Sequence, residues 1–213
     1  MAKRGKASFD TTTANTRVTA HPFVPTDLLD KFEIHEWLLG LTILGAAHKS
    51  EWRDIVTVLS GFRLTEEAIL KGGGNKSTIS RAIDEPLYSR GWKETTFDTR
   101  IVVGDREMAS PTHGVDCYKN RVALEVEWNN KDPFFDRDLN NFRLLFDLRV
   151  IDVGVIVTRC DELQSVFNKL GKGSSYGEAT THLRKLIPRL EGGGGGGCPV
   201  VVLGIRNTTI TRA

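Results

Sequence analysis

The stretch Val115-Asp-Cys-Tyr-Lys-Asn-Arg-Val-Ala-Leu-Glu-Val-Glu-Trp128 carries the clearest structural signal in this sequence of 213 residues. Its β-branched and aromatic residues predict two strands, and the polar residues 119–121 between them predict a turn. Because side chains alternate along a strand, Glu125 and Glu127 project from the same face. Folding back at the turn brings Asp116 alongside them. The sequence therefore places three carboxylates together at one edge of an otherwise apolar sheet.

Three neighbouring carboxylates repel one another and lose hydration, and a bound cation relieves both costs. Oxygen ligands without a nearby pair of histidines or cysteines favour Mg²⁺, with Mn²⁺ as a substitute, over zinc. The alternative is a solvated strand face whose carboxylates pair with Lys119, Arg121 or Lys131. The spacing of the acidic residues leaves both interpretations open.

The segments around this stretch predict an α/β fold, with a central mixed β-sheet flanked by helices. Helical spacing follows Pro25, where Thr26 is a candidate cap and Leu28, Leu29, Phe32 and Leu39 recur as apolar positions. Further helices are expected at 50–59, 63–70, 78–90 with a kink at Pro86, 133–148, 161–170 and 176–190. Strands are expected at 95–103, 150–158 and 199–205, and loops at 104–114 and at the glycine run 192–197.

The length suits one domain, expected at 21–213, with a helical part at about 26–90 and a catalytic core at about 91–206. Residues 1–20 are polar and basic, and we interpret them either as a frayed terminus or as an arm that grasps DNA.

Composition excludes several classes of protein. The 29 basic and 27 acidic residues give a net charge of +2, which argues against coating of nucleic acid by bulk charge but leaves local binding open. Acidic residues outnumber basic ones in 104–152, whereas basic residues dominate 153–213, so the near-neutral total is a cancellation. Three widely separated cysteines support neither a disulfide framework nor a zinc site. Without a long apolar run or a signal peptide, we expect a cytoplasmic protein.

The glycine-rich stretch at 71–78 resembles a phosphate-binding P-loop only superficially. A P-loop has glycine immediately before its lysine, whereas Asn75 precedes Lys76 here, and no apolar strand leads into the loop. Two interpretations remain. Asn75, Lys76 and Ser77 contact a nucleic-acid backbone, or the segment is a plain flexible loop.

Asp116 followed by Glu125-Val126-Glu127 resembles the PD-(D/E)xK nuclease core. More specifically, the pattern from Val115 to Val126 resembles the BglII/BstYI family of type II restriction endonucleases. The likeness continues in Gly91-Trp-Lys-Glu94, Ile151-Asp-Val-Gly-Val155, Ser175-Tyr-Gly-Glu178 and Pro199-Val-Val-Val-Leu-Gly-Ile205, and so covers about residues 90–206.

This resemblance implies a Mg²⁺-dependent, site-specific deoxyribonuclease of a prokaryotic cytoplasm, which cuts double-stranded DNA and leaves 5′-phosphate ends. It assigns Asp116 and Glu125 to the metal, with the Val126 carbonyl as a further ligand. Glu127 stands where the family carries Gln, and a glutamate there could act as a general base, whereas Gln could only orient water. The first alternative is a modified-base-dependent or catalytically altered DNA-binding protein of the same fold. A metal-dependent phosphatase or a structural α/β domain is the other.

Base recognition is expected just beyond the catalytic strand, at Asn129, Asn130 and Lys131, whose side chains suit adenine or guanine edges. By resemblance, Ser174 and Ser175 form a second candidate segment; ordinary polar loops are the alternative for both. A palindromic target read by one small domain implies a homodimer. The apolar helix faces in residues 26–60 supply either part of the dimer interface or a single packed helical layer.

Overall fold

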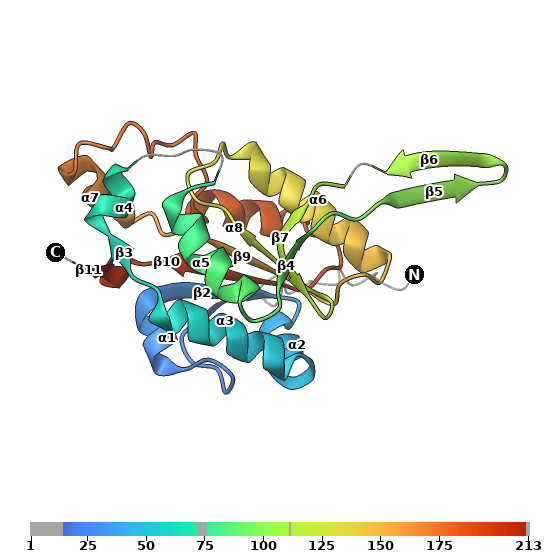
Figure 1. The fold of residues 1–213 in the computed structure, drawn as a ribbon, viewed down its shortest axis with the longest axis horizontal. Coiled ribbons are helices and arrows are strands. Elements are labelled where there is room, and N and C mark those ends of the chain that lie inside the picture. The colour runs from blue at the N-terminus through green and yellow to red at the C-terminus, as the bar shows by residue number, and fades with distance from the viewer. Residues whose placement is uncertain (1–14, 72–75, 111, 212–213) are drawn as a thin grey trace, which may run out of the picture.

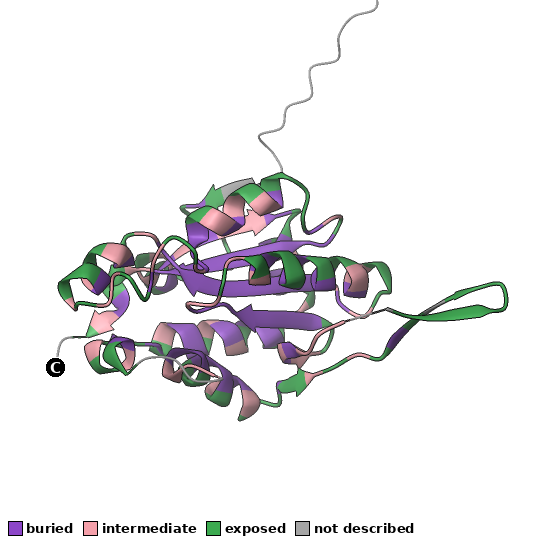
Figure 2. Cartoon of the chain, turned by 90° about the horizontal axis from the view of Figure 1, so that it is seen from above, coloured by how far each residue is buried: buried purple, intermediate pink, exposed green. Residues whose placement is uncertain are grey.

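The computed structural model describes residues 15–71, 76–110 and 112–211. A central sheet has helices on both faces, and a hairpin projects from one end of the molecule (Figure 1). Seen from above, the strands of the sheet are buried between the helical layers, whereas the hairpin is exposed (Figure 2).

The strands are β1 (Asn15–Val18), β2 (Phe32–Trp37), β3 (Leu64–Thr65), β4 (Lys93–Thr95), β5 (Thr99–Val103), β6 (Arg106–Ser110), β7 (Val115–Lys119), β8 (Val122–Val126), β9 (Val153–Arg159), β10 (Val200–Ile205) and β11 (Ile210–Thr211). The helices are α1 (Thr26–Lys31), α2 (Gly40–Ala47), α3 (Lys49–Gly61), α4 (Glu66–Leu70), α5 (Thr78–Tyr88), α6 (Pro133–Asp147), α7 (Leu163–Lys169), α8 (Leu183–Glu191) and the 3₁₀ turn η2 (Asn207–Thr209).

The main sheet is mixed, as the sequence predicts, and its strand order is β1-β2-β10-β9-β8-β7-β4. Strands β8, β9 and β10 run parallel, and the outer pairs are antiparallel. Every residue of β9 and β10 is buried, because both faces of these strands are covered by helices. The β7–β8 hairpin closes at Asn120 and Arg121, which both have positive φ, the conformation that two-residue hairpins favour.

Each face of the sheet has its own core. Helices α3 and α5 cover one face, where Ile55 and Ile83 pack with Leu124 of β8. Helices α6 and α8 cover the other face, where Phe142 packs with Ala123. Helix α6 approaches β9 so closely that a Cβ atom on Gly154 would lie 2.3 Å from the Phe142 ring. The glycine therefore sets the distance between α6 and the strands that carry the acidic residues.

The expectation of helix after residue 31 is wrong, because Phe32–Trp37 forms strand β2. Phe32 and Ile34 are buried, while Glu33 and His35 between them are partly exposed, which is the two-residue period of a strand. Pairing with β10 fixes β2 inside the sheet. The N-cap position of α1 is Pro25 and not Thr26, and no side chain caps this helix.

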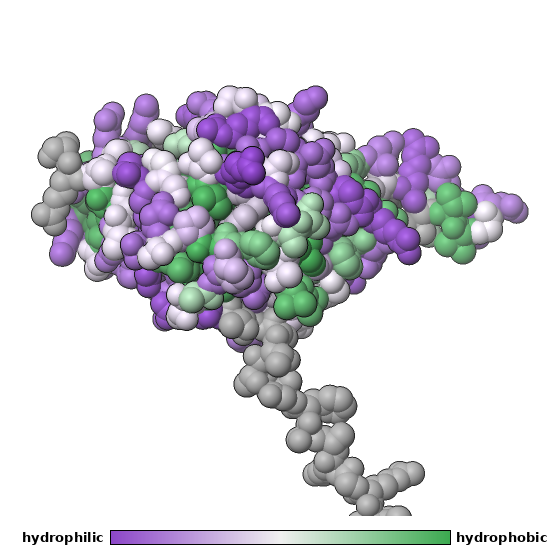
Figure 3. Space-filling view, turned by 90° about the horizontal axis from the view of Figure 1, so that it is seen from below, coloured by the Kyte–Doolittle hydropathy of each residue, from purple (hydrophilic) through white to green (hydrophobic). Residues whose placement is uncertain are grey.

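The expected strand at 95–103 and the loop at 104–114 also need correction. Residues 93–103 are divided between β4, which joins the main sheet, and β5, which pairs with β6 in a separate hairpin. This β5–β6 hairpin exposes Val102, Val103 and Met108, and its apolar side chains are visible at the projecting end (Figure 3). The last helix, α8, begins at Leu183 and not near residue 176.

The end of the segment predicted as a polar arm contributes to the sheet, since β1 pairs with β2. Most apolar side chains of residues 26–60 are buried in one core, to which strand β2 contributes as well as the helices, although Leu39 is 65% exposed. In the described part of the chain, no helix is both long and apolar enough to cross a membrane.

Candidate active site

Asp116 and Glu125 lie together where strands β7 and β8 separate. The ladder of paired residues between these strands ends at Cys117 and Leu124. Beyond it, the Asp116 amide donates to Oε2 of Glu125 at 3.3 Å, and the Val126 amide donates to Oδ2 of Asp116 at 3.1 Å. Each carboxylate is thus oriented by a backbone group of the neighbouring strand. The hairpin brings these two residues together, as the sequence predicts.

Glu125 of β8 and Glu127, which follows the end of this strand, are both covered, and each side chain is only 2% exposed. Helix α6 adds a further carboxylate, Asp138, which is fully buried. Burial, together with the charges of Asp138 and Asp116, raises the pKa of Glu125 well above its ordinary value. Burial, followed by the charge of Asp138, raises the pKa of Glu127 to about 9. Fully ionised, the cluster would therefore carry more negative charge than its surroundings solvate, and a cation would relieve this cost.

Two nitrogen-bearing side chains orient Glu127. Nδ2 of Asn130 donates to its Oε2 at 2.7 Å, and a guanidinium nitrogen of Arg137 lies 3.6 Å from its Oε1. Asn130, predicted as a base-reading residue, is therefore engaged inside the site. Its backbone is held by Thr181, which both donates to and accepts from it.

His113, just before β7, reaches the same cluster. Its Nε2 lies 3.1 Å from Oδ1 of Asp138 and 3.7 Å from Oε1 of Glu125. Nδ2 of Asn141 donates to the His113 carbonyl at 3.3 Å and so fixes the backbone of this residue. An imidazole and two carboxylates consequently meet beneath α6.

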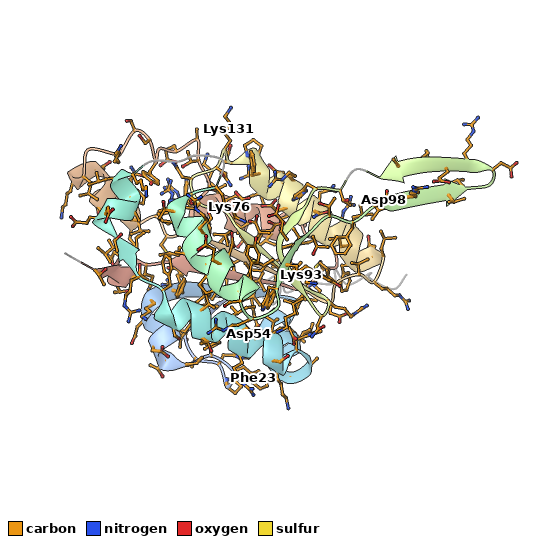
Figure 4. The ribbon with its side chains drawn as sticks, in the orientation of Figure 1. Phe23, Asp54, Lys76, Lys93, Asp98 and Lys131 are labelled. Atoms are coloured by element: carbon orange, nitrogen blue, oxygen red, sulfur yellow. The ribbon has the colours of Figure 1, made fainter. Side chains whose placement is uncertain are left out.

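Lys76 enters the site from the segment before α5 (Figure 4). Its Nζ lies 2.7 Å from Oδ2 of the buried Asp84 and 3.6 Å from Oδ1 of Asp116, and it donates to the Tyr88 hydroxyl at 3.1 Å. Although burial lowers the pKa of Lys76, the hydrogen bonds to Asp84 and Tyr88 outweigh this effect and raise it. Burial raises the pKa of Asp84 to about 6, despite the hydrogen bond from Lys76.

The other residues predicted to contact DNA are dispersed. Asn75 lies outside the described residues. Ser77 caps α5 by accepting from the Ser80 amide at 2.9 Å. Asn129, Lys131, Ser174 and Ser175 lie in loops: Asn129 is partly buried with positive φ, the two serines are exposed, and the exposed Lys131 extends away from the body (Figure 4).

Sequence reasoning overlooked Asp138, His113 and the contact of Lys76 with Asp116. Asp138 had a detectable signal, because it lies between Phe135 and Phe142 at helical spacing, on the face of α6 that packs against the sheet. A carboxylate at such a position needs a charged or polar partner. His113 and Lys76 had no comparable signal, since tertiary packing alone brings them to the cluster.

A mixed sheet with buried carboxylates where a hairpin opens is the arrangement of a restriction-endonuclease-like nuclease. The chain matches the family model described as Restriction endonuclease BglII/BglIII over residues 32–205 and belongs to this family. It is therefore a restriction endonuclease, and membership implies sequence-specific cleavage of double-stranded DNA. The match begins at β2 and so includes more of the N-terminal region than the resemblance in the motifs alone. No curated protein matches the chain.

Proposed function

We propose that this endonuclease cuts DNA at the cluster around Glu125, with Asp116 and Glu125 holding Mg²⁺ and the Val126 carbonyl as a further ligand. The observation that carries the proposal is Oε1 of Glu125, a buried carboxylate oxygen without a hydrogen-bond partner, beside the partly exposed carboxylate of Asp116. Hard oxygen donors whose charge is only partly compensated fit a divalent cation. When bound, Mg²⁺ would polarise the scissile phosphate and acidify a water molecule.

Backbone hydrogen bonds orient the two proposed metal ligands of this site. Hydrogen bonds donated by two backbone amides, one from β7 and one from β8, hold the Asp116 and Glu125 carboxylates in place. Little reorganisation of these side chains is therefore needed when DNA binds. Glu127, held by Asn130, is proposed to position the attacking water or to accept its proton. A carboxylate can accept a proton, whereas the glutamine of the related enzymes can only orient the water molecule.

Lys76 is proposed to contact the DNA backbone at the cut site. Its ammonium group lies between Asp84 and Asp116, so it balances part of the negative charge that would otherwise repel a phosphate. Asn75 and Ser77 flank Lys76 in sequence and are proposed as further backbone contacts. This assignment agrees with the greater share of protein–DNA hydrogen bonds that phosphates receive.

Base recognition is proposed for the loops after β8 and before α8, through Asn129, Asn130, Lys131, Ser174 and Ser175. The Lys131 segment bridges to Thr180, so the two loops are tied to each other beside the cluster. We also propose a homodimer that cuts both strands of a palindromic site, and action in a prokaryotic cytoplasm. The proposed single endonuclease domain spans residues 21–213, and strand β1 adds an edge strand to its sheet.

A modified-base-dependent or catalytically altered DNA-binding protein of the same fold is the second candidate. It is favoured by Glu127 alone, which replaces the family's glutamine and is buried with its pKa raised to about 9. Digestion of modified and unmodified DNA with and without Mg²⁺, followed by run-off sequencing of the ends, separates the candidates. Mg²⁺-dependent double-strand cuts at one sequence in unmodified DNA support the main proposal. Cuts in modified DNA only, or binding without cuts, support the second.

A further inference from the structure

His113 and Asp138 adjoin Glu125, but the cleavage mechanism proposed above gives them no role. One ligand atom from each of these three residues lies within 4.8 Å of the other two. Nε2 of His113 lies 3.1 Å from Oδ1 of Asp138 and 3.7 Å from Oε1 of Glu125. A single ion placed among the three atoms would therefore be within reach of all of them after small side-chain adjustments.

The two carboxylates of this group are not fully satisfied by the protein. Glu125 is 2% exposed and Asp138 fully buried, yet Oε1 of Glu125 and Oδ2 of Asp138 have no hydrogen-bond partner. Arg137 donates only to the other Asp138 oxygen, Oδ1. Buried carboxylate oxygens normally have partners, because leaving them unpaired is costly. Both orphaned oxygens belong to residues that also face the His113 ring.

The donor set differs from that of the proposed catalytic site. Asp116, Glu125 and a carbonyl offer oxygen only, which suits Mg²⁺, whereas an imidazole with two carboxylates suits a transition metal such as Mn²⁺, Co²⁺ or Zn²⁺. We propose that His113, Glu125 and Asp138 form a second cation site, which takes a divalent transition metal in preference to Mg²⁺ and shares Glu125 with the catalytic site. The sharing rests on the proposed function, but the site itself is defined without it.

Asn141 acts as a positioning residue for the proposed site. It is 2% exposed and donates to the His113 carbonyl, so it restrains the loop that carries the imidazole. Loss of such a supporting hydrogen bond lowers metal affinity by about 10-fold or more in other sites. We expect a weakening of this order for Asn141→Ala, with no effect on the site formed by Asp116.

Mn²⁺ titration of the untagged, metal-free full chain tests the proposal by electron paramagnetic resonance, without DNA. We expect two Mn²⁺ ions per wild-type chain, one of which shows pulsed-resonance coupling to an imidazole nitrogen. His113→Gln and Asp138→Asn should each lose this ion, and Asp116→Asn should keep it. Excess Mg²⁺ should displace the uncoupled ion first.

His21→Gln and Asp136→Asn are the matched controls, because His21 lies before α1 and Asp136 is an exposed residue of α6 that pairs with Arg189. Both should retain two ions. The proposal is overturned if folded wild-type protein, verified by circular dichroism, binds Mn²⁺ without nitrogen coupling or if His113→Gln leaves the coupling unchanged. If the wild-type protein neither binds nor cuts DNA, this result would instead count against the proposed function. Failure of the second cation site and failure of the proposed function are therefore distinguishable.

Discussion

Nζ of Lys76 lies 3.6 Å from Oδ1 of Asp116, although forty residues of sequence, including one helix and three strands, separate them. The same ammonium group is 2.7 Å from Oδ2 of Asp84, a buried side chain of α5. Lys76 therefore joins a buried carboxylate to a carboxylate of the proposed catalytic centre. Its removal should affect both the stability of the protein and its handling of phosphate.

Lys76→Met should weaken DNA binding similarly for all sequences and reduce the salt dependence of binding by about one phosphate contact. It should also lower the free energy of unfolding by about 1–3 kcal/mol, because Asp84 loses its partner. Fluorescence anisotropy at several salt concentrations and denaturant titration measure the two effects. Lys93→Met, at an exposed position of β4, is the control and should change neither. An unchanged salt slope for Lys76→Met would contradict the proposed phosphate contact.

Asp116→Ala and Glu125→Ala should each abolish Mg²⁺-dependent cleavage and retain DNA binding in metal-free buffer. Removing a carboxylate takes away a metal ligand and also reduces repulsion of the phosphates, so binding without metal should stay equal or become tighter. Plasmid cleavage and gel-shift measurements, with circular dichroism as a check of folding, compare the variants. Retained Mg²⁺-dependent cleavage by either variant would refute the assignment.

Glu127→Gln separates orientation from proton acceptance. Loss of a general base costs about 10²- to 10⁴-fold in rate. Because the related enzymes carry Gln at this position, we expect the cleavage rate of Glu127→Gln to stay within about 10-fold of the wild-type rate. Glu127→Ala should lose more activity than Glu127→Gln. Single-turnover rates across pH measure the difference. A loss of the full range in Glu127→Gln would make proton acceptance the main role of this glutamate.

The acidic pair in the β7–β8 hairpin could be predicted from sequence because it depends on local rules. Strand alternation and the predicted turn at residues 119–121 suffice to bring Asp116 near Glu125. The burial of Glu127 and the addition of Asp138 depend on how α6 packs against the sheet, and no local pattern fixes that distance. Strand β2 was missed for a related reason. The apolar residues before and within it fit helical spacing, but pairing with β10 stabilises the alternating pattern of residues 32–37.

Gly154→Ala tests whether the approach of α6 to β9 controls the site. An added Cβ atom would lie 2.3 Å from the Phe142 ring, so the helix or the ring must move. Overpacking of this kind costs about 1–3 kcal/mol of the free energy of unfolding. We also expect slower cleavage, because β9 pairs with β8, so a shift between α6 and the sheet should displace Glu125. Gly61→Ala is the control, since a Cβ atom there meets nothing within 4 Å. Chemical denaturation and cleavage rates compare the two, and an unperturbed Gly154→Ala protein would contradict this view of the packing.

Asp152→Asn should lower stability at neutral pH but not in acid. Nε of Arg121 donates to Asp152 at 2.8 Å, and this bond, outweighing the effect of burial and assisted by His48, holds the pKa of Asp152 below its ordinary value. A depressed carboxyl pKa stabilises the folded state above the unfolded pKa of about 3.9, and this contribution disappears as pH falls through the folded pKa. At pH 7 the variant should be less stable by about 1 kcal/mol or less, because the pair is partly exposed. Thermal unfolding is measured between pH 2 and pH 7. The melting temperatures of Asp152→Asn and the wild type should become equal at the lowest pH. Asp105→Asn, in the exposed turn of the β5–β6 hairpin, is the control and should have the melting temperature of the wild type at every pH. If Asp152→Asn still melts at a lower temperature than the wild type at pH 2, the ion pair is not the cause of the difference.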